Sequence, residues 1–331
     1  MQIEENIPLV PFTTFKIGGP ARFFVRARSV EDLKEASAFA RNKNLTALIL
    51  GGGSNVLLRD EGFDGLVIKI EIRGVEEKDG PVIAGAGEEW DTLVRYAIDK
   101  NLWGIENLSG IPGSVGGAVV QGIGAYGQAI GQTLEWAEVF DTESGEIKIF
   151  DARMCAFGYR DSLFKHDGGR TVVLRAAFKL SPNSKPVLSY RDVGLRLQGT
   201  PAIGEVREAI LAIRKNKFPN IAVEGTAGSF FKNPILSLDE VKKLQEVYPD
   251  MPVFAMPETV GMKIPLAWFL DTVLKMKGLR EGRARLFERQ PLVIVVERGA
   301  TATEVRLLAE RVVSRVRDEL AIDIEPEVRI L

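Results

Sequence analysis

The segment 105–127, IENLSGIPGSVGGAVVQGIGAYG, holds seven glycines between Gly110 and Gly127 and no charged side chain after Glu106. Glycine has no Cβ, so it lets the backbone approach another group closely and lets successive amides point in one direction. So much bare backbone indicates that something packs directly against it. The segment predicts either a ligand that lies on peptide groups or a buried loop that crosses a domain core, and the residues alone leave both interpretations open.

A second, shorter stretch has the same character. LILGGGSNVLL (48–58) reads as an apolar strand, a tight glycine-rich loop in which Ser54 and Asn55 add polar donors, and another apolar strand. Amide nests of this kind bind phosphate without a lysine. The dinucleotide fingerprint G-x-G-x-x-G and a Walker lysine are absent, and a purely structural turn also explains GGGSN. Together the two loops favour a long ligand with a diphosphate and a flat ring, such as FAD, with Ile111, Val115 and Ile123 against the ring.

Composition and charge exclude several classes of protein. The 331 residues are 45% hydrophobic and 27% charged, which is typical of a globular chain of two or three domains. The formal net charge of −2 gives no basic surface for nucleic acid or anionic membranes. The first residues, MQIEENIPLVPF, carry acids where a signal peptide would be basic, and no apolar run could span a bilayer. We therefore expect a cytoplasmic location and neither a nucleic-acid nor a membrane partner.

Cysteine and histidine are nearly absent. Cys155 is the only cysteine, so no internal disulfide can form, and His166 is the only histidine. A Ser-His-Asp hydrolase would depend wholly on that one histidine, and Cys/His zinc sites are excluded. We expect no metal, and catalysis by carboxylates, Arg, Lys, Ser, Tyr or a cofactor.

Hydrophobic periodicity and end signals predict the secondary structure. Helices are expected at 31–43, 89–101 and 202–217, and two more after the capping boxes Ser237/Glu240 and Thr301/Glu304. Strands are expected at 46–50, 65–70, 82–86, 133–141, 146–150, 170–180 and 321–331. Because strands and helices stop alternating after residue 104, an α+β fold is favoured over a doubly wound parallel sheet.

The motifs of the chain resemble those of the UDP-N-acetylenolpyruvoylglucosamine reductase family, flavoenzymes that complete UDP-N-acetylmuramate for bacterial peptidoglycan. They occur in the family's order from residue 14 to the C-terminus, and jointly they are highly specific. The matching segments are TFKIGGPA (14–21), LGGGSNVLL (50–58), AGAGEEWDTLV (84–94), GIENLSGIPGSVGGAVVQGIGAYG (104–127), FGYRDSLFK (157–165), AGSFFKNP (227–234) and EPEVRIL (325–331).

The resemblance implies an α+β fold with an FAD-binding part of the vanillyl-alcohol-oxidase type and a smaller substrate domain. We expect FAD-binding subdomains at 1–70, joined by a C-terminal strand at 320–331, and at 71–199, with the substrate domain at 200–319. His166 lies outside both glycine loops, so FAD is expected to bind noncovalently. VLSYRDV (187–193) resembles the tyrosine loop of one family branch, although a tyrosine in an ordinary turn also fits.

The resemblance also implies binding residues. Those expected to hold FAD are Gly51, Gly52, Gly53, Ser54, Asn55, Val56, Ile111, Pro112, Gly113, Ser114, Gly116, Gly117, Ala118, Gly124, Ala125, Tyr126, Gly127 and Arg329. Those expected to contact the substrate are Tyr159, Tyr190, Arg214, Lys217 and Asn233. Lys217 also fits a simpler role, because a cation at the end of a helix complements the helix dipole.

Three residues stand where the family has its catalytic groups. In the implied reaction NADPH reduces FAD, and a hydride then reaches the methylene carbon of an enolpyruvyl ether, driving negative charge into the carboxylate. Arg160 would hold that carboxylate in a planar fork, Ser229 would donate a proton to the neighbouring carbon, and Glu327 would position or polarise the acidic side. Taken singly, they also fit a surface ion pair, a turn hydroxyl and a solvated strand-edge carboxylate.

Four positions depart from the family pattern. Thr13 and Gly122 stand where the family usually has Asn, and Phe287 and Val296 replace a customary His and Asn. The last two put details of substrate or nicotinamide contact in doubt.

Two other functions remain open besides the reductase, which we expect to be a monomer. A flavin oxidase of the same fold would pass electrons to oxygen, and a catalytically silent protein would bind nucleotide sugars only.

Overall fold

The computed structural model describes residues 1–255 and 261–331. Packing divides the chain into two units, and each unit is assembled from separate stretches of sequence. Unit 1 consists of Met1–Phe12, Gly19–Ser54 and Glu61–Asn216; unit 2 consists of Thr13–Gly18, Asn55–Asp60 and Lys217–Leu331. The chain therefore passes several times from one unit to the other before residue 217.

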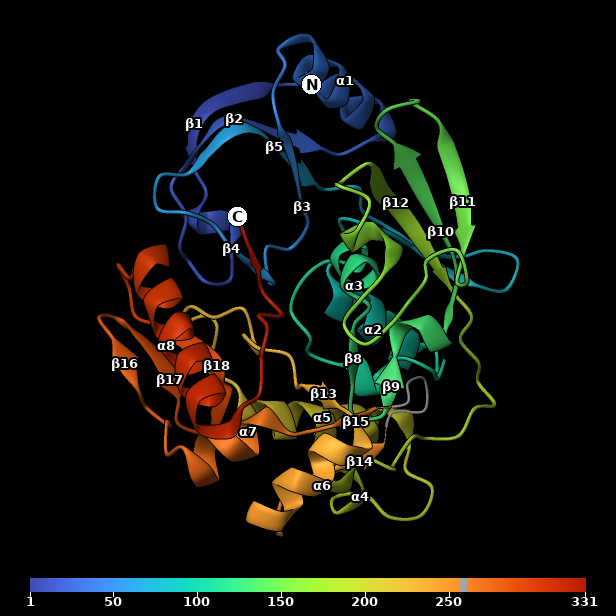
Figure 1. The fold of residues 1–331 in the computed structure, drawn as a ribbon. Coiled ribbons are helices and arrows are strands. Elements are labelled where there is room, and N and C mark those ends of the chain that lie inside the picture. The colour runs from blue at the N-terminus through green and yellow to red at the C-terminus, as the bar shows by residue number, and fades with distance from the viewer. Residues whose placement is uncertain (256–260) are drawn as a thin grey trace. The chain divides into compact units, whose positions relative to one another are not determined.

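Unit 1 begins with a four-stranded sheet in the order β1-β2-β5-β3. Strand β1 (Ile3–Pro8) is antiparallel to β2 (Pro20–Ala27), while β5 (Phe63–Ile70) runs parallel to both β2 and β3 (Ala47–Leu50). Helix α1 (Val30–Asn42) lies on this sheet (Figure 1). It starts at the Ser29–Asp32 capping box, and Leu33, Ala36 and Ala40 make its buried stripe.

The second sheet of unit 1 has five antiparallel strands in the order β11-β10-β12-β7-β6. One apolar core joins both sheets with helices α2 and α3, and α3 packs against β7 and β12. The bounds are β6 Val75–Glu77, β7 Val82–Gly85, β10 Leu134–Asp141, β11 Ile147–Asp151, β12 Thr171–Phe178, α2 Trp90–Asp99 and α3 Val115–Gln121; the hairpin β8 (Gly124–Ala125) and β9 (Gln128–Ala129), α4 (Arg191–Gly194) and α5 (Ile203–Lys217) follow.

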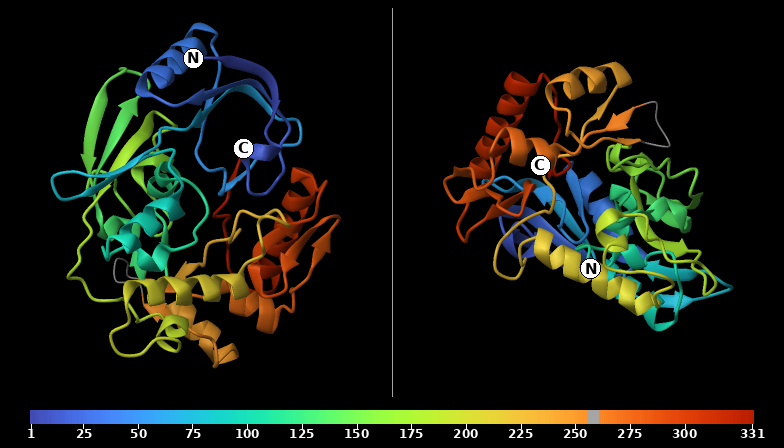
Figure 2. Two further views of the ribbon diagram at one scale, coloured as in Figure 1. Left: turned by 180° about the vertical axis from the view of Figure 1, so that it is seen from behind. Right: turned by 90° about the horizontal axis from the view of Figure 1, so that it is seen from below.

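Unit 2 is built on helix α8 (Ala302–Leu320), which covers an antiparallel sheet of β16 (Arg280–Glu281), β17 (Ala284–Phe287) and β18 (Gln290–Val296), as Figures 1 and 2 show. Unit 2 also has a parallel pair, β4 (Val56–Leu57) with β19 (Arg329–Ile330), and a small antiparallel sheet in the order β13-β15-β14. The remaining elements are β13 (Ile235–Leu236), α6 (Leu238–Val247), β14 (Phe254–Ala255), β15 (Met262–Lys263), α7 (Leu266–Trp268) and a π-helix at Phe269–Val273.

The periodic segments form the elements that their patterns predict. The capping boxes at Ser237/Glu240 and Thr301/Glu304 open α6 and α8 as predicted. The buried face of α8 includes Val305, Leu308, Val312, Val316 and Leu320. The C-terminal prediction is wrong in extent, because only Arg329–Ile330 of 321–331 form a strand. Ile322 and Ile324 instead bury their side chains in the core, and Pro326 has no N–H to donate to a ladder.

Helix α5 belongs to unit 1 up to Asn216. Its apolar face packs on Trp103 and Tyr126 through Ile203, Val206 and Ile210. The domain boundaries at residues 70, 199 and 319 stay predictions. In the described part of the chain, none of the helices combines the length and the apolar character needed to cross a bilayer.

Candidate functional site

The two glycine-rich loops, the first within 48–58 and the second within 105–127, touch each other backbone to backbone in unit 1. A Cβ on Gly52 would lie 2.5 Å from Cα of Gly113 and 2.8 Å from N of Ser114. A Cβ on Gly51 would lie 2.6 Å from Oγ of Ser114. These distances are too short for any side chain, so the missing Cβ atoms are what bring the loops together.

The first loop ends with unused donors. Within the described residues, the backbone N–H groups of Gly52, Gly53 and Ser54 have no hydrogen-bond acceptor, and Gly53 is buried. Buried amides are nearly always paired, so such a row of free N–H groups fits an anion with several acceptor oxygens. The loop is therefore suited to the diphosphate of a dinucleotide.

A cation also stands at this loop, which sequence reasoning missed. Lys69 lies opposite Leu50 in the β3–β5 pair, and its Nζ donates a 2.6 Å hydrogen bond to the carbonyl of Gly51. Burial lowers the pKa of Lys69, although Glu71 opposes the effect. The one available signal was a lone lysine in the apolar run LVIKI.

The second loop leads directly into helix α3. The Ser114 hydroxyl accepts a 3.3 Å hydrogen bond from the N–H of Gly117, and the Gly116 N–H donates to the carbonyl of Ala86. A Cβ on Gly116 would lie 2.8 Å from Cβ of Ala86, so this glycine serves helix packing. Val115 is fully buried in the apolar core of unit 1, so the expectation that it faces a ring is wrong.

Tyr126 and the predicted tyrosine loop meet in unit 1. Tyr126 sits at the turn of the β8–β9 hairpin with φ +51°, and its ring lies edge-on to Tyr190 at 5.2 Å between centroids. Asn107 ties the two segments together, because its Nδ2 donates to the carbonyls of Tyr126 (2.7 Å) and Val187 (2.8 Å). The segment that carries Tyr190 is thus fixed beside the glycine-rich chain.

Arg160 lies in a strained turn of unit 1. Its φ of +56° is unusual for a residue with a Cβ, and such strain is concentrated at functional sites. The guanidinium faces the Tyr159 ring at 5.6 Å, and its Nη1 lies 3.4 Å from where a Cβ on Gly124 would be. Lys165 donates from Nζ to the carbonyl of Arg160 at 2.6 Å. The structure therefore brings Tyr159, Arg160 and the β8 glycine together.

Ser229 and Glu327 lie on adjoining segments of unit 2. Ser229 forms a β-bridge with Val293 of β18, and the next residue, Phe230, accepts a 2.7 Å hydrogen bond from the Glu327 N–H. Because Arg160 belongs to unit 1, the arrangement of all three catalytic candidates stays a prediction.

Three FAD candidates also gather in unit 2. Nδ2 of Asn55 donates to the carbonyl of Glu327 at 3.1 Å, and the Arg329 N–H donates to the carbonyl of Asn55 at 3.1 Å. Val56 pairs with Arg329 in the β4–β19 ladder. Nearby in sequence to Ser229, Asn233 uses its Oδ1 to accept the N–H of Leu266, which leaves its amide nitrogen as the group for a ligand.

The substrate candidates of helix α5 differ in their surroundings. Arg214 is partly buried, and its Nε donates to the carbonyl of Gly110 at 3.0 Å. Burial lowers the pKa of Arg214, while a hydrogen bond with Tyr126 opposes that shift. Lys217 is the last residue of the helix.

The departures from the family pattern have local explanations. Gly122 ends α3 with φ +60°, and a Cβ there would lie 2.5 Å from the carbonyl oxygen of Asp161, so an asparagine would collide. Thr13 donates its hydroxyl to the carbonyl of Ile17 at 3.0 Å. Phe287 and Val296 are buried among apolar side chains.

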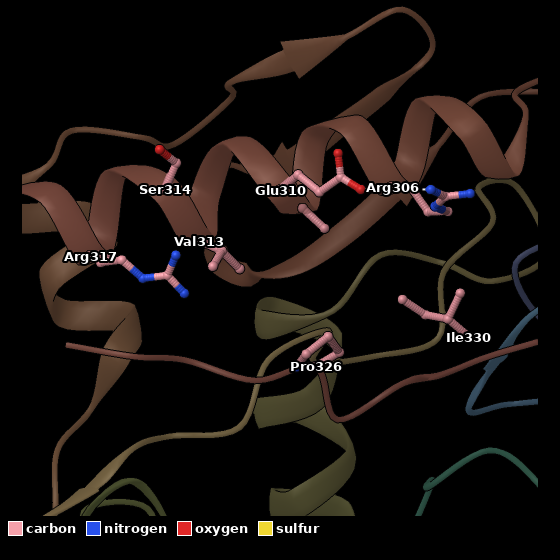
Figure 3. Close-up of a pocket in the computed structure, with 8 residues that line it drawn as sticks. Arg306, Glu310, Val313, Ser314, Arg317, Pro326 and Ile330 are labelled. Carbon is pink, nitrogen blue, oxygen red and sulfur yellow. Dashed lines mark ion pairs between the residues drawn. The ribbon is translucent and has the colours of Figure 1, made fainter.

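A groove of about 310 Å³ lies between α8 and the C-terminal segment of unit 2. In Figure 3, Val313 of the helix faces Pro326 and Ile330 across it. Its arginines are engaged, since Arg306 pairs with Glu310 at 3.7 Å and Arg317 with Asp323 at 2.8 Å. None of the predicted site residues lines this groove.

Two protein-family matches cover the glycine loops and the C-terminal motifs. Residues 21–151 match an FAD binding domain, and residues 220–331 match the UDP-N-acetylenolpyruvoylglucosamine reductase C-terminal domain. The FAD-binding α+β fold predicted from sequence is thereby confirmed.

Individual relatives extend the match over the whole chain. UDP-N-acetylenolpyruvoylglucosamine reductase of Pseudomonas aeruginosa is 38% identical, with 99% of this chain and 98% of the relative covered. The Amoebophilus asiaticus reductase is also 38% identical, with both chains covered fully. A crystal structure of the Thermus caldophilus reductase superposes with a TM-score of 0.72 at 27% identity, covering 100% and 99% of the two chains. The family expected from the motifs is confirmed, and the chain belongs to the UDP-N-acetylenolpyruvoylglucosamine reductase family.

Proposed function

We propose that this protein uses NADPH and noncovalently bound FAD to reduce UDP-N-acetylglucosamine enolpyruvate to UDP-N-acetylmuramate, a precursor of peptidoglycan. The observation that carries the proposal is the match to reductases over 99% of the chain. The contact between the two glycine loops supports it, because the loops offer free amides beside closely packed backbone. A monomeric state and a cytoplasmic location stay predictions.

Different FAD candidates would bind different parts of the cofactor. The amides of Gly52, Gly53 and Ser54 would hold the diphosphate, with Lys69 supporting the loop through the Gly51 carbonyl. Asn55, Val56 and Arg329, which unit 2 brings together, are proposed to add further contacts. When bound, FAD supplies the hydride that the substrate receives.

The charge that develops on the substrate decides which side chains matter. Hydride addition to the methylene carbon places negative charge on the substrate's carboxylate, and a guanidinium such as that of Arg160 stabilises it in a bidentate contact. The adjacent carbon then needs a proton, and Ser229 is the group proposed to donate it. Glu327 would polarise the acidic side of the site.

The nucleotide part of the substrate requires its own contacts. Tyr190 and Lys217 are proposed to meet the diphosphate, and the free amide nitrogen of Asn233 suits an acceptor oxygen. Tyr159 and Arg214 complete the substrate set. The contact of Tyr190 with Tyr126 supports this assignment, because it fixes the tyrosine loop beside the glycine-rich segment.

A visible spectrum followed by NADPH oxidation tests the proposal. We expect a yellow protein that consumes NADPH steadily only when UDP-N-acetylglucosamine enolpyruvate is present. Rapid reoxidation of the reduced protein by air without substrate would point to an oxidase. Colourless protein that still binds UDP-sugars would point to a silent binding protein.

A further inference from the structure

The peptide of Gly110, at the start of the second glycine loop, is held from both sides. Its N–H donates to Oδ1 of Asp91 at 2.6 Å, and its carbonyl accepts from Nε of Arg214 at 3.0 Å. Gly110 has φ +68°, and a Cβ there would lie 2.7 Å from Cδ2 of Leu211. The loop therefore starts from a glycine that has almost no freedom to move.

Asp91 is in turn held by an arginine far along the chain. Nη1 and Nη2 of Arg207 donate to Oδ1 and Oδ2 of Asp91, both at 2.7 Å, in the parallel fork that guanidinium and carboxylate prefer. The side chains are 15% and 21% exposed. Burial raises the pKa of Asp91, but the hydrogen bonds from Arg207 and from the Gly110 N–H outweigh it, and the pKa lies below its usual value.

Helix α5 carries both arginines that hold the Gly110 peptide, Arg207 through Asp91 and Arg214 directly. Arg207 and Arg214 lie seven positions apart on it, which is about two turns, so they point from the same face. One reaches the Gly110 N–H through Asp91, and the other reaches the carbonyl directly. A single rigid helix thus fixes the orientation of one peptide group.

The sequence after Gly110 makes that orientation important. Ile111 and Pro112 lead directly to Gly113 and Ser114, which touch Gly52 of the first loop. Proline has a fixed φ, which removes one of the backbone rotations through which the chain between Gly110 and Gly113 could absorb a change at Gly110. The orientation of the Gly110 peptide therefore influences how the two loops present their backbone.

We infer that Asp91 and Arg207 are a positioning pair that orients the Gly110 peptide so that the loop 110–114 meets FAD. The inference rests on the proposed function only in taking FAD as the ligand. Neither residue is expected to touch the reacting atoms. The pair acts at a distance, by holding the peptide that the glycine loop starts from.

The full-length holoprotein provides the test. Arg207→Lys keeps the positive charge but loses the planar fork, and Asp91→Asn keeps an oxygen for the Gly110 N–H but loses the negative charge. We expect both variants to release FAD at least ten-fold more readily on dilution, measured by the rise in free-flavin fluorescence. The visible spectrum of the bound flavin should shift. The double variant should release FAD no faster than whichever single variant releases it faster, because both substitutions break the same pair.

Arg175→Lys is the matched control. Arg175 makes a fork with Glu138, both contacts at 2.9 Å, in the β10–β12 pair of the same unit, and its exposed side chain bonds to neither glycine loop within the described residues. We expect this variant to keep wild-type FAD release and spectrum. If Asp91→Asn fails to fold, Arg207→Lys decides alone.

Two results would overturn the inference. One is wild-type FAD release and spectrum in folded Arg207→Lys; the other is an equal loss in Arg175→Lys, which would mark a general effect of stability. The proposed function fails differently, since a wild-type protein that binds FAD but does not oxidise NADPH with substrate would leave this comparison intact.

Discussion

The contact between Gly52 and Gly113 predicts what a single methyl group would do. In Gly52→Ala the new Cβ would meet backbone atoms at 2.5–2.8 Å, and backbone cannot swing aside as a side chain can. Overpacking of this kind costs about 1–3 kcal/mol. We expect a lower melting temperature and about ten-fold or greater loss of FAD affinity, measured by flavin fluorescence.

Gly204→Ala is the control for that change. Gly204 lies in α5 with no atom within 4 Å of where its Cβ would be. Alanine is the better helix former by roughly 0.5–1 kcal/mol, so this variant should be slightly more stable and bind FAD normally. Equal behaviour of the two variants would contradict the close loop contact.

The proton donor is tested by separating the two half-reactions. Ser229→Ala should leave reduction of the flavin by NADPH nearly unchanged, while reoxidation by the enolpyruvyl substrate slows by about 10²–10⁴-fold, the usual contribution of a general acid. Rapid mixing in the absence of air measures each step. Ser314→Ala, which removes an exposed hydroxyl of α8, should alter neither. Normal reoxidation in Ser229→Ala would rule Ser229 out as the acid.

Among the elements, the β10–β11 hairpin is held by one carboxylate, that of Asp141 at the end of β10. Asp141 accepts hydrogen bonds from the N–H groups of Glu143 and Ser144 and from the side chains of Arg170 and Lys148. The bond from Arg170 is the main reason that the pKa of Asp141 lies well below its usual value. A depressed carboxyl pKa gives stability that is complete above the unfolded pKa of about 4 and is lost as the pH falls towards the folded one.

Asp141→Asn tests the direction in which the stability contributed by Asp141 changes with pH. We expect a lower melting temperature at pH 7, with the difference from wild type narrowing as the pH is reduced below about 4. Asp64→Asn is the control, because Asp64 pairs with Arg22 at an exposed position where ion pairs contribute little. A difference that stayed constant across the pH range would show that Asp141 acts only through its neutral hydrogen bonds.

Local sequence patterns predict which helices and strands form, but they do not predict every point at which these elements begin and end. The capping boxes of α6 and α8 are readable because all the groups involved lie within four residues. The C-terminal strand was predicted too long because alternation alone cannot show that Ile322 and Ile324 bury their side chains in the core. Val115 was misplaced for a similar reason, since a glycine-rich pattern hides the short helix α3.

The candidate site divides in the same way. The glycine loops could be found from sequence because their signal is local and compositional. Lys69 and the Asp91–Arg207 pair could not, since each depends on a partner brought close by folding, and Asp91 and Arg207 are 116 residues apart. The family resemblance supplied residue roles that no spacing could supply.

At the scale of the whole molecule, FAD should contribute to stability. A ligand that binds only the folded state stabilises it by about 2.7 kcal/mol at one hundred times its Kd. We expect flavin-free protein to melt at a lower temperature, and added FAD to raise that temperature in a concentration-dependent way. Riboflavin should do much less, because it lacks the diphosphate that the amides of Gly52, Gly53 and Ser54 are proposed to hold. Equal effects of the two compounds would place the diphosphate elsewhere.

The way the chain alternates between its units has a consequence for synthesis. Phe15, Ile17 and Leu57 belong to the core of unit 2, but the rest of that core comes after residue 217. Their burial must close a loop of about 170–210 residues, which is entropically costly and slow. During synthesis on the ribosome, these three apolar side chains would stay exposed to solvent until most of the chain has emerged. A fragment that starts at residue 217 would lack them, and it should therefore be prone to aggregation.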